Sequence, residues 1–193
     1  MPSMSARTAC ILDGGRAGDE SANAAEAVVR RLLSKRGWSE RTFRLCELEI
    51  GPCRGCFACW VKTPGICIID DVAREIARTV VRSELVVFLT PVTFGGYSSE
   101  LKKAVDRLIP LILPFFKLVG NEVHHVPRYA RYPSLLGVGL LGDSSAAKER
   151  IFRRLIERNA INLHAPQAKA CVIDPGDSNP GSILTPALRQ VVV

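Results

Sequence analysis

The sequence predicts an α/β fold, a doubly wound sheet of five parallel strands with helices on both faces. Segments with the pattern of a strand alternate with segments with the pattern of a helix, as they do in βαβ units. The strand segments are apolar on both faces, which is typical of a sheet that helices cover on both sides. The strongest of them is Leu-Val-Val-Phe-Leu at residues 85–89.

The first half of the chain contains two of these strands. The first, at 7–13, ends in a glycine-rich turn and leads into a helix at 21–36, whose apolar residues recur at i, i+3, i+4 and i+7. The second strand, at 41–46, is polar enough to lie at an edge of the sheet. An irregular, cysteine-rich segment covers 47–69. A helix over about 70–81, capped by one of two aspartates, closes this half.

The second half contains the other three strands. The third, at 84–90, runs into a loop that opens with Pro91, and Ser98 caps the helix that follows until further prolines interrupt it. Residues 115–133 form a connection that is too long for a simple turn. The remaining elements are a strand at 135–141, a helix at 144–162 and a strand at 169–173.

Length and composition indicate one soluble domain. The 193 residues suit a single core, which we assign to residues 1–175, with the Pro-, Gly- and Ser-rich residues 176–193 as a C-terminal tail. The chain shows neither an apolar run of membrane-spanning length nor a signal peptide, so we expect a cytoplasmic protein that does not contact a membrane. The net charge of +7 is spread over helix faces, which favours solvated faces over a nucleic-acid partner.

A sheet of this kind binds its ligand beyond the carboxyl ends of its strands, at the point where the strand order reverses. The flavodoxin-like and the classical dinucleotide-binding orders both fit. Either order places the site in the loops at 14–23, 90–98 and 142–145. The first loop offers backbone N–H groups and the positive end of a helix to a phosphate. The candidates from the first and third of these loops are Gly14, Gly15, Arg16, Ser21, Asn23, Gly142 and Asp143.

The loop after the third strand carries a family resemblance. Thr90-Pro91-Val92-Thr93-Phe94-Gly95 resembles the stretch that borders the flavin ring in the group of NADPH-dependent FMN reductases and iron–sulfur flavoproteins, and the helix with Asp106 and Arg107 resembles the one that follows it there. The resemblance implies a flavodoxin-like fold that binds FMN. The implied ring-site residues are Thr90, Pro91, Val92, Thr93, Phe94 and Gly95.

Four of the seven cysteines lie close together. Cys53, Cys56, Cys59 and Cys67 form the pattern C-x2-C-x2-C-x7-C, which resembles the cysteine run that holds a [4Fe-4S] cluster in iron–sulfur flavoproteins. Three interpretations remain open from the residues themselves: a cluster, a zinc site with the same four thiolates, or free thiols near the flavin. The other three cysteines are expected to be small buried hydrophobes, at Cys10, Cys46 and Cys171.

These features imply an FMN-dependent NAD(P)H oxidoreductase that passes electrons to a small-molecule acceptor or a redox protein. The alternatives are a non-catalytic electron carrier of flavodoxin type, an iron–sulfur flavoprotein fed by ferredoxin, and a flavin-free domain with structural zinc. The resemblance also implies a homodimer or homotetramer. No side chain is assigned as an acid or base, because the cofactor carries the chemistry.

Overall fold

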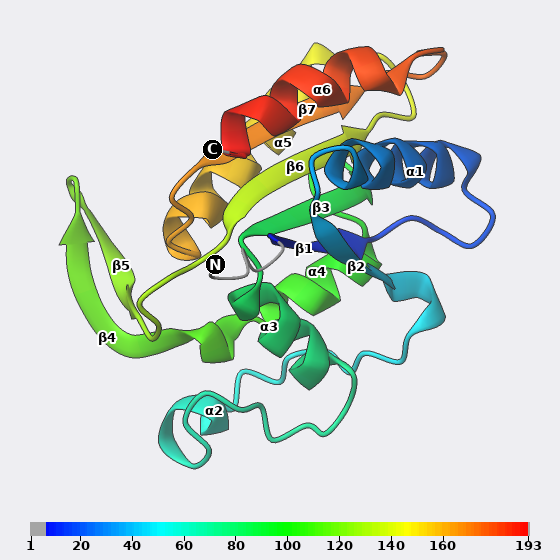
Figure 1. Cartoon of the computed structure of the whole chain (residues 1–193). Coiled ribbons are helices and arrows are strands. Elements are labelled where there is room, and N and C mark those ends of the chain that lie inside the picture. Colours follow the sequence, from blue (N-terminus) through cyan, green and yellow to red (C-terminus); the bar gives the residue numbers. More distant parts are fainter. Residues whose placement is uncertain (1–6, 193) are drawn as a thin grey trace, which may run out of the picture.

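The structure, a computed structural model, describes residues 7–192. Its centre is a five-stranded parallel sheet in the order β2-β1-β3-β6-β7 (Figure 1). This is the flavodoxin-like order, so the predicted fold class is confirmed. The strands are β1 (Thr8–Asp13), β2 (Ser39–Arg44), β3 (Leu85–Pro91), β6 (Ser134–Leu140) and β7 (Ala168–Ile173).

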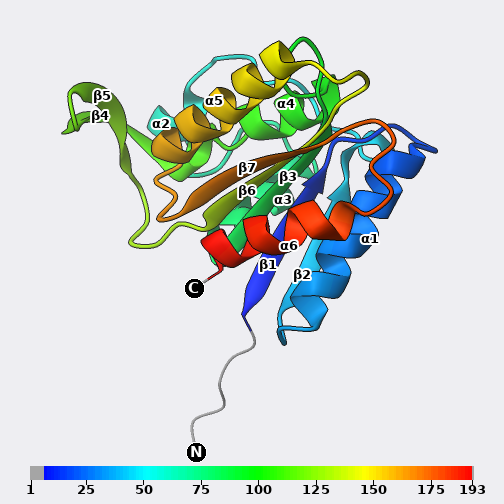
Figure 2. The ribbon, with the colours of Figure 1, turned by 90° about the horizontal axis from the view of Figure 1, so that it is seen from above.

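Helices cover both faces of the sheet, as Figure 2 shows. One face is covered by α1 and α6, and the other by α3, α4 and α5. The short α2 lies in the cysteine-rich segment. The bounds are α1 (Glu20–Ser34), α2 (Ala58–Val61), α3 (Ala73–Arg82), α4 (Ser99–Asp106), α5 (Ala146–Asn162) and α6 (Pro180–Val191), with 3-10 turns η1 (Leu45–Glu47) and η2 (Ile109–Leu111).

The alternation of side chains in β3 explains why two layers of helix are needed. Leu85 and Val87 are buried in the core shared with α1 and α6, whereas Val86 and Phe88 are buried in the core shared with α3, α4 and α5. A strand that is apolar on both faces can bury all of its side chains only between two such layers. Among the described residues, no helix has both the length and the apolar character that crossing a membrane requires.

Two predicted segments differ from the structure. The connection expected at 115–133 contains a β-hairpin of β4 (Ile112–Val119) and β5 (Glu122–Pro127), which projects beside the sheet (Figure 1). The two-residue turn between Val119 and Glu122 places Gly120 at φ 60°, and Gly-Asn is a turn sequence typical of hairpins. The sequence does not indicate this hairpin, because its strand residues do not alternate between apolar and polar.

The C-terminal segment assigned to a tail contains α6, which packs beside α1 (Figure 2). Leu184, Ala187, Leu188 and Val191 are buried against the sheet. Proline at the first helical position is favourable. Pro186, however, lies inside the helix, and a proline at such a position normally argues against a helix in the sequence. The strand expected at 41–46 also begins earlier, at Ser39, because Ser39 pairs with Thr8 at the start of β1.

Candidate functional site

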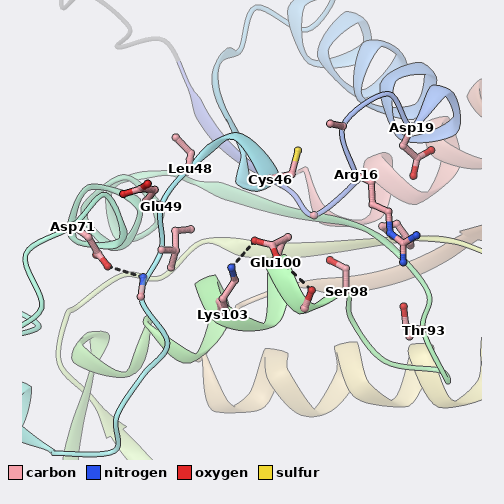
Figure 3. Close-up of a pocket in the computed structure, with 16 residues that line it drawn as sticks. Arg16, Asp19, Cys46, Leu48, Glu49, Asp71, Thr93, Ser98, Glu100 and Lys103 are labelled. Carbon is pink, nitrogen blue, oxygen red and sulfur yellow. Dashed lines mark hydrogen bonds and ion pairs between the residues drawn. The ribbon is translucent and has the colours of Figure 1, made fainter.

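A pocket of about 1080 Å³ opens at the carboxyl ends of β1 and β3 (Figure 3). The chain continues from β1 to β2 on one side and reaches β3 on the other, so the pocket lies at the point where the strand order reverses. The loops after β1, β2 and β3 and the start of α4 supply its walls. The lining residues are Gly14, Arg16, Ala17, Asp19, Cys46, Leu48, Glu49, Ile50, Gly51, Asp71, Pro91, Thr93, Ser98, Ser99, Glu100 and Lys103.

The first loop brings a cation and a helix N-terminus to the pocket. Asp19 caps α1, and its carboxylate accepts a hydrogen bond of 3.0 Å from the N–H of Ala22. Figure 3 shows the exposed Arg16 side chain extending over the side of the pocket where Ser98 and Thr93 lie. Within residues 7–192, Arg16 has no ion-pair partner. The predicted candidates Gly14 and Arg16 therefore do line one cavity.

Gly15 helps to fix the conformation of this first loop. Its N–H donates to the buried Asp13 carboxyl at 2.8 Å, so that N–H points away from the pocket. A Cβ at position 15 would lie 2.6 Å from the Cβ of Ala22, which only glycine avoids. Burial, and to a smaller extent the neighbouring Glu26 carboxyl, raise the pKa of Asp13, although the Gly15 N–H acts in the opposite direction. The first loop therefore begins next to two buried acids, Asp13 and Glu26.

The loop after β3 contributes Pro91 and Thr93 to the pocket. Thr90 is fully buried, and its hydroxyl oxygen accepts the N–H of Ser98 at 2.9 Å, which ties the two ends of the loop together. Ser98 then caps α4, as predicted, by accepting the N–H of Leu101. The cap and the buried threonine hold the pocket-lining part of this loop in a fixed conformation.

Like Thr90, the other three predicted residues of this loop do not line the pocket. Val92 is buried, and its side chain lies so close to Gly139 that it would collide with a Cβ added there. Val92 therefore packs on the α5 side of the sheet. Phe94 is 91% exposed. Gly95 has φ 84° and lies against Ile151 of α5, where an added Cβ would come within 2.6 Å. Gly95 is therefore required by the turn and by its packing.

Four further predicted residues lie away from this pocket. Ser21 and Asn23 are exposed residues of α1, and neither lines it. Gly142 and Asp143 follow β6; both are exposed, and Asp143 pairs with Lys148 at 2.8 Å. The loop after β6 thus contributes nothing to the pocket wall.

The segment after β2 is expected at this end of the sheet because of its cysteines, but residues 46–51 are not among the predicted FMN-binding residues, and they form one wall of the pocket. Cys46, Leu48 and Ile50 belong to it. The signal was available, because β2 lies next to β1 and its carboxyl end must meet the same edge of the sheet. Cys46 is exposed there, so the prediction of a buried cysteine is wrong at this position. It is confirmed for Cys10 and Cys171, where burial raises each thiol's pKa to about 12.

The charges of the pocket leave one cation unpaired within the described chain. Lys103 pairs with Glu100 at 2.7 Å. Asp71 pairs with Arg107, which lies outside this pocket. Although burial acts against it, hydrogen bonds from Arg107 and from the Gly51 N–H hold the pKa of Asp71 below its usual value. An anionic ligand group would therefore be drawn to the Arg16 side of the pocket.

The four clustered cysteines line a second cavity of about 300 Å³, together with Phe57 and Arg107. Cys53 and Cys56 are exposed, Cys59 is buried, and Cys67 is intermediate. Burial raises the pKa of the Cys59 thiol, and the charges of Cys67, Cys53 and Cys56 raise it further. All four predicted cysteines therefore line one cavity. As they stand, the described His, Cys, Asp and Glu side chains form no group of three that could hold a metal ion.

Two comparisons of sequence place the chain beside known flavoproteins. The sequence profile of the family described as NADPH-dependent FMN reductase matches residues 11–123, more than half of the chain. An iron–sulfur flavoprotein of Methanocaldococcus jannaschii is 34% identical over 83 residues, which are 43% of this chain and 42% of that protein. One of Methanosarcina thermophila is 31% identical over 80 residues, 42% of this chain and 41% of that protein. The matched region thus spans about two fifths of these relatives.

Solved structures share the fold at low identity. The NAD(P)H:quinone oxidoreductase of Methanothermobacter marburgensis has a TM-score of 0.68 at 12% identity, over 96% of this chain and 94% of that one. An FMN-dependent NADH-azoreductase of Bacillus anthracis, solved with FMN, has a TM-score of 0.59 at 10% identity, over 91% and 92%. At such identities the likeness shows the arrangement of the sheet and helices.

Proposed function

Because the chain belongs to the NADPH-dependent FMN reductase family, we propose that it is an NAD(P)H-dependent oxidoreductase that passes electrons through FMN to a small-molecule or protein acceptor. The observation that carries this proposal is the pocket at the switch point of the sheet. It combines an arginine that has no ion-pair partner among the described residues, a helix N-terminus and a proline-stiffened loop. Those are the groups that a phosphorylated planar ligand needs.

The residues of the pocket fit FMN. Its volume of about 1080 Å³ is large enough for a nucleotide-sized ligand. Arg16 would hold the phosphate by charge, and the loop at 14–19, which lines the pocket, would add backbone N–H groups. Pro91 and Thr93 on one wall, and residues 48–51 on the other, would flank the ring. FMN, when bound, supplies the hydride-transfer and electron-transfer chemistry.

The contribution of the chain is to bind and orient. Thr90 and Ser98 fix the loop that carries Pro91 and Thr93, because their hydrogen bond closes that loop on itself. The Asp13–Gly15 hydrogen bond fixes the start of the phosphate loop in the same way. These contacts preorganise the loop at 90–98 and the start of the phosphate loop before a ligand arrives, which lowers the ordering cost of binding.

Two measurements test this function. Flavin extracted from the purified protein and separated by chromatography should be FMN. Anaerobic NADPH should then bleach the bound flavin rapidly, whereas a non-catalytic electron carrier of flavodoxin type would bleach slowly. A protein that gains no chromophore even after FMN is added would contradict the proposal, and would favour a flavin-free domain.

A second function is favoured by the cysteine cavity. We propose that Cys53, Cys56, Cys59 and Cys67 hold a [4Fe-4S] cluster, which would supply single-electron exchange with a redox protein such as ferredoxin. The donor set fits, since four thiols of one short segment line one cavity. The relatives named as iron–sulfur flavoproteins support it. Binding of a cluster would require the four thiols to come closer together, because no three of the described His, Cys, Asp and Glu side chains now form a group that could hold a metal ion.

Metal analysis separates the three interpretations of the cysteines. Anaerobically purified protein should contain iron and acid-labile sulfide, and Cys56→Ser should lose both while it keeps FMN. Zinc without sulfide would favour the zinc site, and the absence of any metal would favour free thiols. Neither result would affect the flavin proposal, because its pocket is lined by none of these four cysteines.

A further inference from the structure

Arg107 is a buried arginine between the two cavities. It follows α4 directly, its side chain is 1% exposed, and it lines the cysteine cavity. Its partner Asp71 lines the pocket proposed for FMN. The pair is bidentate, with Nη1 to Oδ2 and Nη2 to Oδ1 both at 2.8 Å. This ion pair is therefore a wall that both cavities share.

The terminal nitrogens of Arg107 are fully used. Besides its two bonds to Asp71, Nη1 donates to the carbonyl of Gly51 at 2.6 Å and Nη2 donates to the carbonyl of Ile69 at 3.1 Å. Gly51 precedes the four cysteines and Ile69 follows them, so one guanidinium fastens both ends of the cysteine segment. An arginine has five N–H donors, and four are now accounted for.

The fifth donor, the Nε–H, is left without a partner. Nε of Arg107 is buried and has no hydrogen-bond acceptor among the described residues. Leaving such a donor unpaired costs free energy, so an acceptor is expected nearby. The Cys67 sulfur is the close candidate. Cys67 lines the same cavity as Arg107, and although burial acts against it, the neighbouring Asp71 and Cys67 raise the pKa of Arg107.

We propose that Arg107 is a positioning residue of the four-cysteine site, and that its Nε–H donates a hydrogen bond to a sulfur of that site, either the Cys67 thiolate or a sulfide of the bound cluster. The inference rests on the cluster proposed above. The bidentate bond to Asp71 holds the guanidinium plane, and this fixes the direction in which the Nε–H can donate. Hydrogen bonds to the sulfurs help to set a cluster's reduction potential and its retention.

A neighbouring arginine provides a matched control. Nε of Arg74 donates to the backbone carbonyl of Cys67 at 2.8 Å, and its side chain is 30% exposed. Arg74 also fastens the cysteine segment, but from outside, and it does not line the cysteine cavity. If Arg107 only anchored the backbone, Arg107→Lys and Arg74→Lys should have comparable effects.

The test compares the two variants with the wild type, each reconstituted anaerobically with iron and sulfide. Lysine keeps the charge of Arg107 but has no Nε–H. Arg107→Lys should bind FMN, lose iron to a chelator about tenfold faster than the wild type, and show a more negative cluster potential. Arg74→Lys should match the wild type in both measurements. A folded Arg107→Lys with the wild-type potential and rate of iron loss would overturn the inference.

A measurement on protein with Arg107 intact covers the case in which Arg107→Lys does not fold. Arg54 also lines the cavity, so it is first replaced by lysine to leave Arg107 as the arginine of the cavity lining. The Arg54→Lys protein is labelled with ¹⁵N-arginine, its cluster is reduced, and it is studied by pulsed electron paramagnetic resonance. A hyperfine coupling from an arginine nitrogen is expected, and it should persist when Arg74→Lys is added. Its absence would overturn the inference. A wild-type protein that takes up FMN but no iron would overturn the cluster proposal together with this one, and would leave the flavin proposal standing.

Discussion

At the scale of single residues, Arg16 carries the proposed recognition of the FMN phosphate. Arg16→Ala should weaken FMN binding about tenfold to a hundredfold, since a charge-assisted hydrogen bond is worth about 1.5–3 kcal/mol. Affinity for riboflavin, which lacks the phosphate, should hardly change. Fluorescence titration of the apoprotein with both flavins measures this. Arg31→Ala, in the last turn of α1, makes the same change in net charge and should bind both flavins like the wild type.

Asp13 gives a prediction about pH. The pKa of Asp13 is raised in the folded protein, so its contribution to stability is fully present below its unfolded pKa of about 3.9. That contribution is lost as the pH rises through the higher pKa of the folded state. Asp13→Asn should therefore raise the melting temperature at pH 7, with a gain that fades toward acidic pH. Asn can still accept the Gly15 N–H.

Thermal melts of Asp13→Asn and the wild type across pH measure this effect. The control is Asp143→Asn, which removes the exposed partner of Lys148 and should change little at any pH. A melting temperature that falls at pH 7 in Asp13→Asn would show that the ionised carboxylate is required under the loop.

Only some site residues could be found from the sequence. Gly14, Arg16, Pro91 and Thr93 follow the strands that meet at the switch point, and the topology rule suffices for them. Side-chain direction within a loop follows from tertiary packing instead. Val92 and Gly95 turn toward α5 because Gly139 and Ile151 lie there, and no local pattern encodes that.

At the scale of elements, the central strands and their helices were predictable because periodicity and burial agree in them. β3 and α3 are examples, each with a clear apolar pattern. The β4–β5 hairpin and α6 were not, since neither has a clean period. The hairpin has exposed phenylalanines, and α6 has a proline inside it. Contacts with the rest of the molecule stabilise both elements.

The role of α6 can be measured directly. Leu184 is completely buried against the sheet, so Leu184→Ala should lower the free energy of unfolding by about 2–5 kcal/mol. Gln190→Ala, at an exposed position of the same helix, should cost almost nothing. Chemical denaturation of the two variants compares them. Equal stabilities would mean that the C-terminal segment behaves as a tail after all.

At the scale of the whole molecule, the hairpin presents an apolar face to solvent. Phe116 lies opposite His125, and Leu118 lies opposite Val123, so these side chains share one face of the hairpin. Phe116, Leu118 and Val123 are 65%, 73% and 64% exposed. The other face carries His124, which is buried and hydrogen-bonded to Asn162 of α5. Contiguous exposed apolar surface of this kind is typical of an interface.

We therefore expect a homodimer or homotetramer in which this face is covered by a second copy of the chain. Light scattering after size exclusion should give a multiple of the chain mass. Phe116→Ser combined with Leu118→Ser should shift the protein toward the monomer. Ile151→Ser, at a half-exposed apolar residue of α5, should leave the assembly unchanged. A monomeric wild type, or a double variant that stays assembled, would contradict this expectation.

The central claim is that FMN occupies the pocket at the carboxyl ends of β1, β2 and β3. Hydrogen–deuterium exchange of the apoprotein with and without FMN tests it most directly, because bound ligand slows exchange in the loops that it contacts. The account predicts protection of residues 14–19, 46–51 and 91–98, with none at 142–145. Protection confined to other segments, or unchanged exchange in all three loops at saturating FMN, would contradict it.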